Sequence, residues 1–98
     1  MELSEKQKKH LRGLAHSLDP VARLGNAGVT EAFLQELDRA LDHHELVKMK
    51  VTAADRETRD AAIQAVLARS RAVLVTRIGN VAVLYRRHPE TPRIQLPG

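Results

Sequence analysis

The stretch RLGNAGVT, residues 23–30, joins a short apolar run to a predicted helix. Gly25 and Gly28 stand three positions apart, and because glycine has no Cβ they let the backbone turn sharply and approach another molecule closely. Thr30 is the predicted N-cap of the helix that follows, since threonine side chains accept hydrogen bonds from the first amides of helices. The stretch therefore predicts a strand-to-helix turn, the unit from which α/β folds are built.

The start of this predicted helix is a candidate phosphate site. Its first amides have no partner within the helix and carry the positive end of the helix dipole, and both features favour a bound anion. The loop lacks the third glycine of dinucleotide-binding loops and the Gly-Lys-Ser/Thr of Walker loops. Its length fits better the loop with which KH domains clamp the RNA backbone. A plain turn without a ligand is the alternative, since glycine is the usual turn residue.

A first helix is predicted ahead of this stretch. It begins at Ser4, because Ser4 and Gln7 have the spacing of a capping box. It ends before Pro20, since the residue preceding a proline avoids helical geometry. Its apolar residues recur at helical spacing and are expected to face the core, namely Leu11, Leu14 and Leu18.

The pattern of the remaining chain predicts strands that alternate with helices. A strand over 21–24 is followed by a helix over 31–43, a strand over 45–51, a helix capped by Asp55 that runs to about residue 69, and strands over 72–78 and 81–86. Gly79 and Asn80 between the last two strands are typical of a two-residue hairpin turn. The order α-β-α-β-α-β-β predicts an α/β fold, a two-layer sandwich of three helices and a mixed four-stranded sheet.

A chain of 98 residues is expected to form one domain, here residues 1–87. Three prolines lie among residues 88–98, and we expect this segment to be an extended, flexible C-terminal tail.

The composition excludes several classes of function. The chain has no cysteine, which rules out disulfides, thiolate zinc sites and cysteine nucleophiles. No apolar run approaches the roughly 20 residues of a membrane span, so we expect a cytoplasmic protein without a membrane partner. The five histidines lack metal-ligand spacing, and neither a serine elbow nor a paired acid site is evident. We therefore expect no metal, no cofactor and no enzymatic activity.

The charge of the chain favours a nucleic-acid partner. Sixteen basic residues against twelve acidic ones give a net charge of +4, and the pI is near 10. The positive charge gathers toward the two ends of the chain, and a solubilising surface is the alternative interpretation. The candidate RNA-contacting residues are the loop with its cap and nearby cations: Gly25, Asn26, Ala27, Gly28, Thr30, Lys6, Lys9, Arg12, Arg23 and Arg86.

Aromatic residues are too few for a base-stacking platform, because Phe33 and Tyr85 are the only two. We therefore expect contacts to phosphate and sugar, which position a protein on RNA but read little sequence.

Six short motifs together resemble the CRM domain (chloroplast RNA splicing and ribosome maturation) in its stand-alone bacterial form, the YhbY-like proteins. The motifs are SEKQ (4–7), LRGLAH (11–16), GNAGVTE (25–31), HHELVK (43–48), DRET (55–58) and IGNxxVLYR (78–86). The resemblance implies a small α/β fold similar to the C-terminal domain of translation initiation factor three. It also implies that the glycine loop and the basic first helix contact RNA. Many relatives carry a lysine in or beside the loop, where this chain has Asn26 and Ala27, and we expect Arg23 to supply that charge.

The resemblance further implies association with precursors of the large ribosomal subunit and no enzymatic activity. We therefore predict a monomeric RNA-binding protein whose partner is ribosomal RNA of large-subunit precursors, with ribosomal proteins as further candidate partners. One alternative is a protein–protein adaptor that docks through the acidic second helix, with Glu31, Glu36, Asp38 and Asp42. The other is a small hydrolase or metal protein that uses the histidines.

Overall fold

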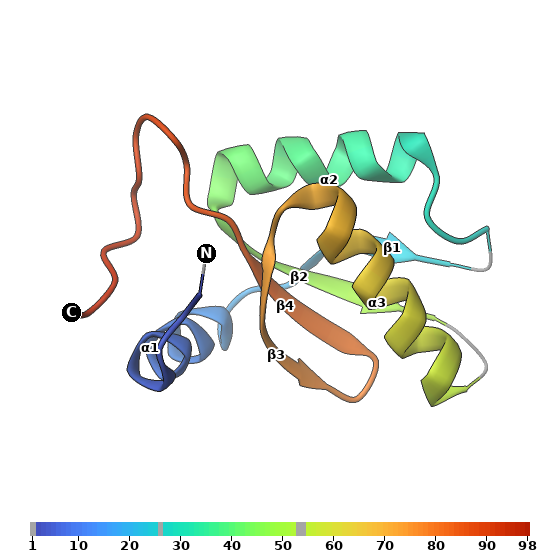
Figure 1. Ribbon diagram of the computed structural model, residues 1–98, viewed down its shortest axis with the longest axis horizontal. Coiled ribbons are helices and arrows are strands. Elements are labelled where there is room, and N and C mark those ends of the chain that lie inside the picture. Colours follow the sequence, from blue (N-terminus) through green and yellow to red (C-terminus); the bar gives the residue numbers. More distant parts are fainter. Residues whose placement is uncertain (1, 26, 53–54) are drawn as a thin grey trace.

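The computed structural model describes residues 2–25, 27–52 and 55–98. Over these residues the chain forms seven elements (Figure 1): α1 (Glu5–Ala15), β1 (Pro20–Leu24), α2 (Glu31–His44), β2 (Leu46–Val51), α3 (Arg56–Ser70), β3 (Val73–Ile78) and β4 (Val81–Tyr85). The predicted order α-β-α-β-α-β-β is confirmed, and the boundaries lie within a few residues of their predicted places.

Each helix begins at a polar side chain that accepts a hydrogen bond from the first turn. Ser4 Oγ accepts from the amide of Gln7 (3.1 Å), while Gln7 Oε1 accepts from the amide of Ser4 (2.9 Å) and completes the capping box. Thr30 and Asp55 cap α2 and α3 through their side-chain oxygens, as predicted. These caps fix where the helices start relative to the strands before them.

The four strands form one mixed sheet in the order β1-β2-β4-β3. β1 pairs in parallel with β2, and α2 is the crossover that parallel pairing requires. β4 is antiparallel to both β2 and β3. As a result, the carboxyl ends of β1 and β2 and the β3–β4 hairpin lie at the same end of the sheet.

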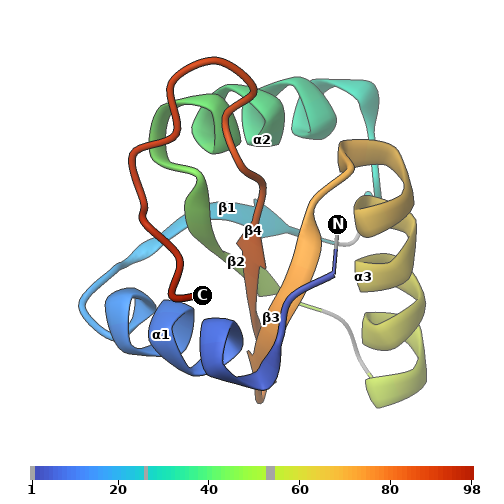
Figure 2. The same cartoon turned by 60° about the vertical axis from the view of Figure 1, so that its left-hand side comes forward.

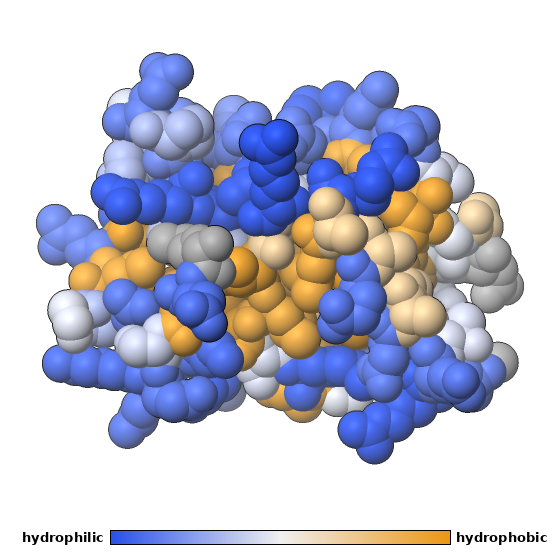
Figure 3. Space-filling model, in the orientation of Figure 1, coloured by the Kyte–Doolittle hydropathy of each residue, from blue (hydrophilic) through white to orange (hydrophobic). Residues whose placement is uncertain are grey.

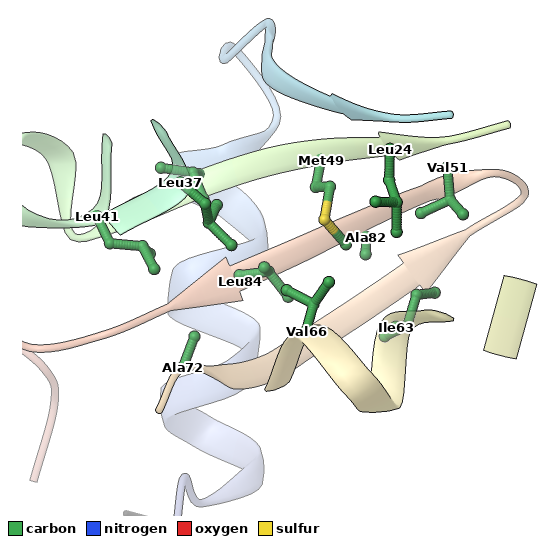
Figure 4. Packing of buried hydrophobic residues seen from close by; sticks show 11 residues of the cluster. Leu24, Leu37, Leu41, Met49, Val51, Ile63, Val66, Ala72, Ala82 and Leu84 are labelled. Carbon is green, nitrogen blue, oxygen red and sulfur yellow. The ribbon is translucent and has the colours of Figure 1, made fainter. Parts of the chain in front are cut away.

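Two helices cover one face of the sheet. Leu37 of α2 and Val66 of α3 point toward Met49 of β2 and Leu84 of β4, as Figure 4 shows. The other buried members of this first core are Leu24, Leu41, Val47, Val51, Ile63, Ala72 and Ala82.

The opposite face of the sheet is covered by α1, and Figure 2 shows α1 and α3 on opposite sides of it. The second core, under α1, is formed by Leu11, Ala15, Leu46, Val75, Val83 and Tyr85. Helices therefore lie on both faces, which differs from the expected two layers. The physical reason is that successive residues of β4 are apolar and point to opposite faces, so both faces need cover.

The register of α1 also differs from the prediction. Leu11 is fully buried as expected, but Leu14 and Leu18 are 41% and 37% exposed. Ala15 takes the second inward position, four residues after Leu11. The helix ends at Ala15, so Leu18 lies outside it.

The C-terminal segment, residues 88–98, packs against the domain instead of projecting from it. Glu45, fully buried at the end of α2, is its attachment point. Glu45 Oε2 accepts from the amide of His88 (2.9 Å), and Glu45 Oε1 accepts from the amides of Arg93 (2.7 Å) and Ile94 (2.9 Å). Ile94 and Leu96 pack on the second core. The predicted flexible tail is thus irregular in structure but held by a carboxylate and by apolar contacts.

Burial raises the pKa of Glu45, but the hydrogen bonds from the amides of His88, Arg93 and Ile94 outweigh that effect. Together with the charge of Arg93, they hold the pKa below its ordinary value of 4.5. The carboxylate is therefore ionised at neutral pH, which strengthens its three hydrogen bonds.

The surface in the orientation of Figure 1 is divided by polarity. Hydrophilic side chains gather along α2, whereas an apolar band lies over α3 and β3 (Figure 3). This band makes the middle of that face a poor match for a polyanion. None of the helices in the described residues is both long and apolar enough to span a bilayer.

Candidate nucleic-acid interface

The glycine loop, residues 25–28, connects β1 to α2, and the structure describes its residues 25, 27 and 28. The amide of Gly28 donates to the carbonyl of Gly25 (3.0 Å), and Gly28 has a φ of +76°, a left-handed conformation that favours glycine. Gly25 and Ala27 are exposed. Thr30 caps α2 directly after the loop, so the positive end of the α2 dipole lies beside it. Asn26, which was also predicted to contact RNA, lies outside the described residues.

Two further segments meet the loop at the same end of the sheet (Figure 1). The amide of Thr52 donates to the carbonyl of Leu24 (2.9 Å), which holds the end of β2 against the start of the loop. The amide of Val51 donates to the carbonyl of Asn80 (2.7 Å), which joins the β3–β4 hairpin to the same place. The loop and the hairpin therefore belong to one continuous surface.

Arg23 and Lys50 lie side by side next to the loop, because they are register partners in β1 and β2. Their neighbours Leu24 and Val51 point into the first core, so Arg23 and Lys50 project on the α1 side of the sheet. The same row continues across the sheet to the half-buried Val81 and to Ile78, which is 71% exposed. We call this uncovered region the open sheet face, defined by Arg23, Lys48, Lys50, Ile78 and Val81.

The cations of α1 lie away from the loop. Lys6, Lys9 and Arg12 are exposed, but α1 packs on the end of the sheet that is far from the loop. Figure 1 places α1 and the loop at opposite ends of the longest axis, along which the molecule extends 38 Å. The structure thus does not bring the basic first helix next to the glycine loop, and the open sheet face lies between them.

Arg86 is held inside the protein. Its guanidinium contacts carboxylate oxygens of Asp38 (2.6 Å) and Asp42 (2.9 Å) and donates to the carbonyl of Ser70 (2.9 Å). The side chain is 19% exposed. A guanidinium engaged in this way has few donors left for a phosphate, so we do not expect Arg86 to contact RNA.

Comparison with known proteins identifies the family, because residues 3–86 match the model of the CRS1/YhbY (CRM) domain. The chain belongs to the CRM domain family. The resemblance inferred from the six motifs is thereby confirmed.

Two bacterial relatives are similar to this CRM domain over nearly their whole length. An RNA-binding protein of Haemophilus influenzae is 52% identical over 95 residues, which cover 97% of this chain and 95% of the relative. A "Probable RNA-binding protein" of Bacillus subtilis is 37% identical over 95 residues, which cover 97% and 99%. These relatives are named as RNA-binding proteins and not as enzymes.

A solved structure has the same fold. The solution structure of a hypothetical protein from Staphylococcus aureus matches this CRM domain with a TM-score of 0.82 and 33% sequence identity. The match covers 98% of this chain and 100% of that chain. The predicted α/β fold with three helices and a mixed four-stranded sheet is therefore confirmed.

The acidic residues of α2 in this CRM domain are largely engaged within the molecule. Glu31 forms an ion pair with Arg69, and Asp38 and Asp42 bind Arg86. Three of the four carboxylates proposed for an adaptor surface thus already have partners in the same chain, which makes α2 a weaker docking face for a basic protein.

The histidines of the CRM domain do not gather. Within residues 2–25, 27–52 and 55–98, no group of three or more histidine, aspartate or glutamate side chains is placed to hold a metal ion. His88 Nδ1 instead accepts from the amides of Glu90 (3.1 Å) and Thr91 (3.0 Å), which shapes the C-terminal segment. The described part of the chain gives no support to the alternative of a metal protein.

Three arginines that the sequence reasoning passed over lie at the loop end of the molecule. Arg56 and Arg59 belong to the first turns of α3, and Arg77 belongs to β3. The one available signal was the motif DRETR, which places two cations at a helix start, where the dipole disfavours them.

Proposed function

We propose that this CRM domain binds RNA through the sugar-phosphate backbone, with the glycine loop and the open sheet face as its contact surface. The observation that carries the proposal is the hydrogen bond between Gly28 and Gly25 that turns the chain before α2, with Arg23 and Lys50 in register beside it. Bare backbone next to a helix N-terminus suits a phosphate, and two neighbouring cations suit the next ones along a strand.

The open sheet face gives the RNA a path across the molecule. Lys48 and Lys50 on β2 present positive charge, while Val81 and Ile78 present apolar surface on the same side. Cations neutralise phosphates, and apolar side chains accept the flat or hydrophobic parts of ribose and base. A strand that starts at the loop and crosses this face arrives at α1, where Lys6, Lys9 and Arg12 are exposed. The basic helix thus serves as a second contact and not as part of the loop site.

The RNA partner that we propose is ribosomal RNA in precursors of the large subunit. Two observations support this choice. The chain belongs to the CRM family, for which we expect association with large-subunit precursors, and its bacterial relatives are named as RNA-binding proteins. Crosslinking in cells followed by RNA sequencing tests this part. Crosslinks that fall mainly outside large-subunit ribosomal RNA would show that the proposed target is wrong.

The loop is tested by Ala27→Asp, with Ala27→Ser as the matched control. Ala27 is exposed, so both variants are expected to fold. A carboxylate about 4 Å from a phosphate costs at least about 1 kcal/mol, so Ala27→Asp should weaken binding to protein-free large-subunit ribosomal RNA at least about fivefold. Ala27→Ser should bind as the wild type does. Equal affinity of the aspartate variant and the wild type would show that the loop is not the site.

The open sheet face is tested by Lys50→Gln, with Arg39→Gln as the control on the outer side of α2. Log affinity should fall with log salt at a slope of about −0.7 per phosphate contacted on a single strand. Lys50→Gln should lose one phosphate contact and so make that slope shallower by about 0.7, whereas Arg39→Gln should leave the slope unchanged. Binding without salt dependence would contradict backbone recognition, and no binding to protein-free RNA would favour the adaptor.

A further inference from the structure

A hollow of about 460 Å³ opens between the start of α3 and the β3–β4 hairpin, and its lining residues are Arg56, Arg59, Arg77 and Gly79. We call it the arginine pocket. Its volume lies within the roughly 300–1,000 Å³ that is common for ligand sites. Its lining is cationic instead of apolar, which selects for an anion.

Hydrogen-bonding capacity in the arginine pocket is left unused. Within the part of the chain that the structure describes, Nε of Arg59 and Nε of Arg77 are buried and have no hydrogen-bond partner. Buried donors without partners are rare in native proteins, and a bound ion or ligand is one way in which such donors are satisfied. Arg59 of α3 and Arg77 of β3 both line the hollow, so their guanidinium groups, each with several N–H donors, can share a single tetrahedral anion.

The residues that line the pocket are positively charged, and carboxylates lie beside it. Asp60 is the carboxylate beside it, and it pairs with Arg77 Nη1 and lies 4.0 Å from Arg56 Nε. Asp55 and Glu57 are further carboxylates at the start of α3. Asp55 accepts hydrogen bonds from the amide and hydroxyl of Thr58 as the cap of α3, and it also interacts with the charge of Arg59. Three guanidiniums thus line the hollow, and no carboxylate is among the lining residues that the structure describes.

Two of these arginines lie at an electrostatically unfavourable position. Arg56 and Arg59 follow the N-cap of α3, where the helix dipole is positive and disfavours cations. A sequence that keeps two cations at such a place carries an electrostatic conflict that a bound anion relieves. If the arginines only made the surface soluble, nothing would offset this unfavourable interaction with the helix dipole.

We propose that the arginine pocket binds a phosphate group, and that in the RNA complex this is a second backbone phosphate of the strand held by the glycine loop. The hairpin carries Gly79 into the pocket and joins β2 through Asn80, at the end of the sheet where the loop lies. The choice of RNA as the source of the phosphate rests on the proposed function. The phosphate chemistry of the pocket rests on its own residues.

The wild-type protein is titrated with inorganic phosphate while the arginine Nε–H signals are followed by NMR. The Arg59 and Arg77 signals should shift and saturate, while the signal of Arg39 on α2 should not. Uniform, non-saturating drift of all arginine signals would overturn the proposal, because it is the behaviour of an adventitious ion.

The variant Asp60→Asn supplies a test in which phosphate binding is expected to become tighter. Removal of the neighbouring carboxylate should tighten phosphate binding at the pocket at least about fivefold, since a like charge near the anion is lost. An arginine pair that only braces the fold would instead lose stability without any gain in phosphate affinity, and that result would overturn the proposal.

RNA titrations with Arg59→Gln and Arg77→Gln then identify the source of the phosphate. Each variant should make the salt slope of RNA binding shallower by about 0.7, the value for one phosphate on a single strand, and Arg39→Gln should not. An unchanged slope in both, while Ala27→Asp still loses affinity, refutes the second backbone contact and leaves the loop site standing. Saturable phosphate binding by a wild type that binds no RNA would instead refute the proposed function and keep the pocket as an anion site.

Discussion

Replacement of Glu45 by glutamine should detach the C-terminal segment at a substantial cost in stability. The carboxylate is fully buried and accepts three amide hydrogen bonds, from His88, Arg93 and Ile94. Glutamine keeps the shape, and its carbonyl oxygen can replace Oε1, which serves two of the amides. Its NH₂ group then faces the amide of His88, so two donors meet.

The cost follows from these three bonds. A hydrogen bond to a charged group contributes about 1.5–3 kcal/mol, and an unsatisfied buried donor costs about 1–3 kcal/mol. Loss of one bond and weakening of the other two therefore predict a loss of about 2–4 kcal/mol, from a total of about 5–15 kcal/mol for a typical domain. In urea unfolding the midpoint should fall by at least about 1 M. Hydrogen exchange at the amide of His88 should accelerate more than at the amides of Ile94 and Arg93.

The same change should alter the pH dependence of stability. Although burial raises the pKa of Glu45, the amide hydrogen bonds hold it below its ordinary value of 4.5 in the folded state. The carboxylate therefore contributes stability that is complete above 4.5 and is lost as the pH falls through the folded-state pKa. Below about pH 4.5 the wild type should lose stability more steeply than Glu45→Gln does.

A double-mutant cycle with deletion of residues 88–98 isolates the attachment itself. The deletion leaves Glu45 without its three amide donors, so in that background Glu45→Gln should be neutral or stabilising. Additive effects of the two changes, or a urea midpoint for Glu45→Gln equal to that of the wild type, would refute the assignment of this carboxylate as the attachment point.

Four further substitutions test other parts of the structure. Gly28→Ala should destabilise the protein by about 1 kcal/mol, because the backbone of Gly28 is in the left-handed conformation. Gly13→Ala, at an exposed position in the middle of α1, should stabilise it by about 0.5–1 kcal/mol. Thermal melts compare the two variants. Arg86→Gln removes the ion pairs with two carboxylates of α2, so the free energy of unfolding measured in urea should fall by about 1–3 kcal/mol. The RNA affinity of this variant should stay within twofold of the wild-type value. Tyr85→Phe should be neutral or stabilising, because among the described residues its buried hydroxyl has no partner, and a clear loss of stability would show a bond through water.

The order of elements could be predicted because its signals are local. The cap residues Ser4, Thr30 and Asp55 mark helix starts, and Gly79 with Asn80 marks the hairpin. The side of the sheet that α1 covers could not be predicted, because an amphipathic stripe says that a helix has a buried face but not which surface buries it. The same ambiguity led to Leu14 being assigned to the core in place of Ala15.

The candidate site was predictable only where it is contiguous in sequence. The loop with its cap was found from a run of eight residues, whereas the pairing of Arg23 with Lys50 depends on strand register. The arginine pocket joins α3 to β3, and no periodic pattern links residues of different elements. Glu45 was assigned to the start of a strand, because its role depends on amides 43 to 49 positions later in the chain.

The second core draws its residues from both ends of the chain, with Leu11 and Ala15 of α1 on one side and Ile94 and Leu96 on the other. The first core needs nothing beyond Leu84. We therefore expect the first core to form before the second during synthesis on the ribosome. Once β4 has left the ribosome, all residues of the first core are available, whereas the second core still lacks its last members. Stalled nascent chains of increasing length should gain protease resistance around β2 and β4 before they gain it around α1.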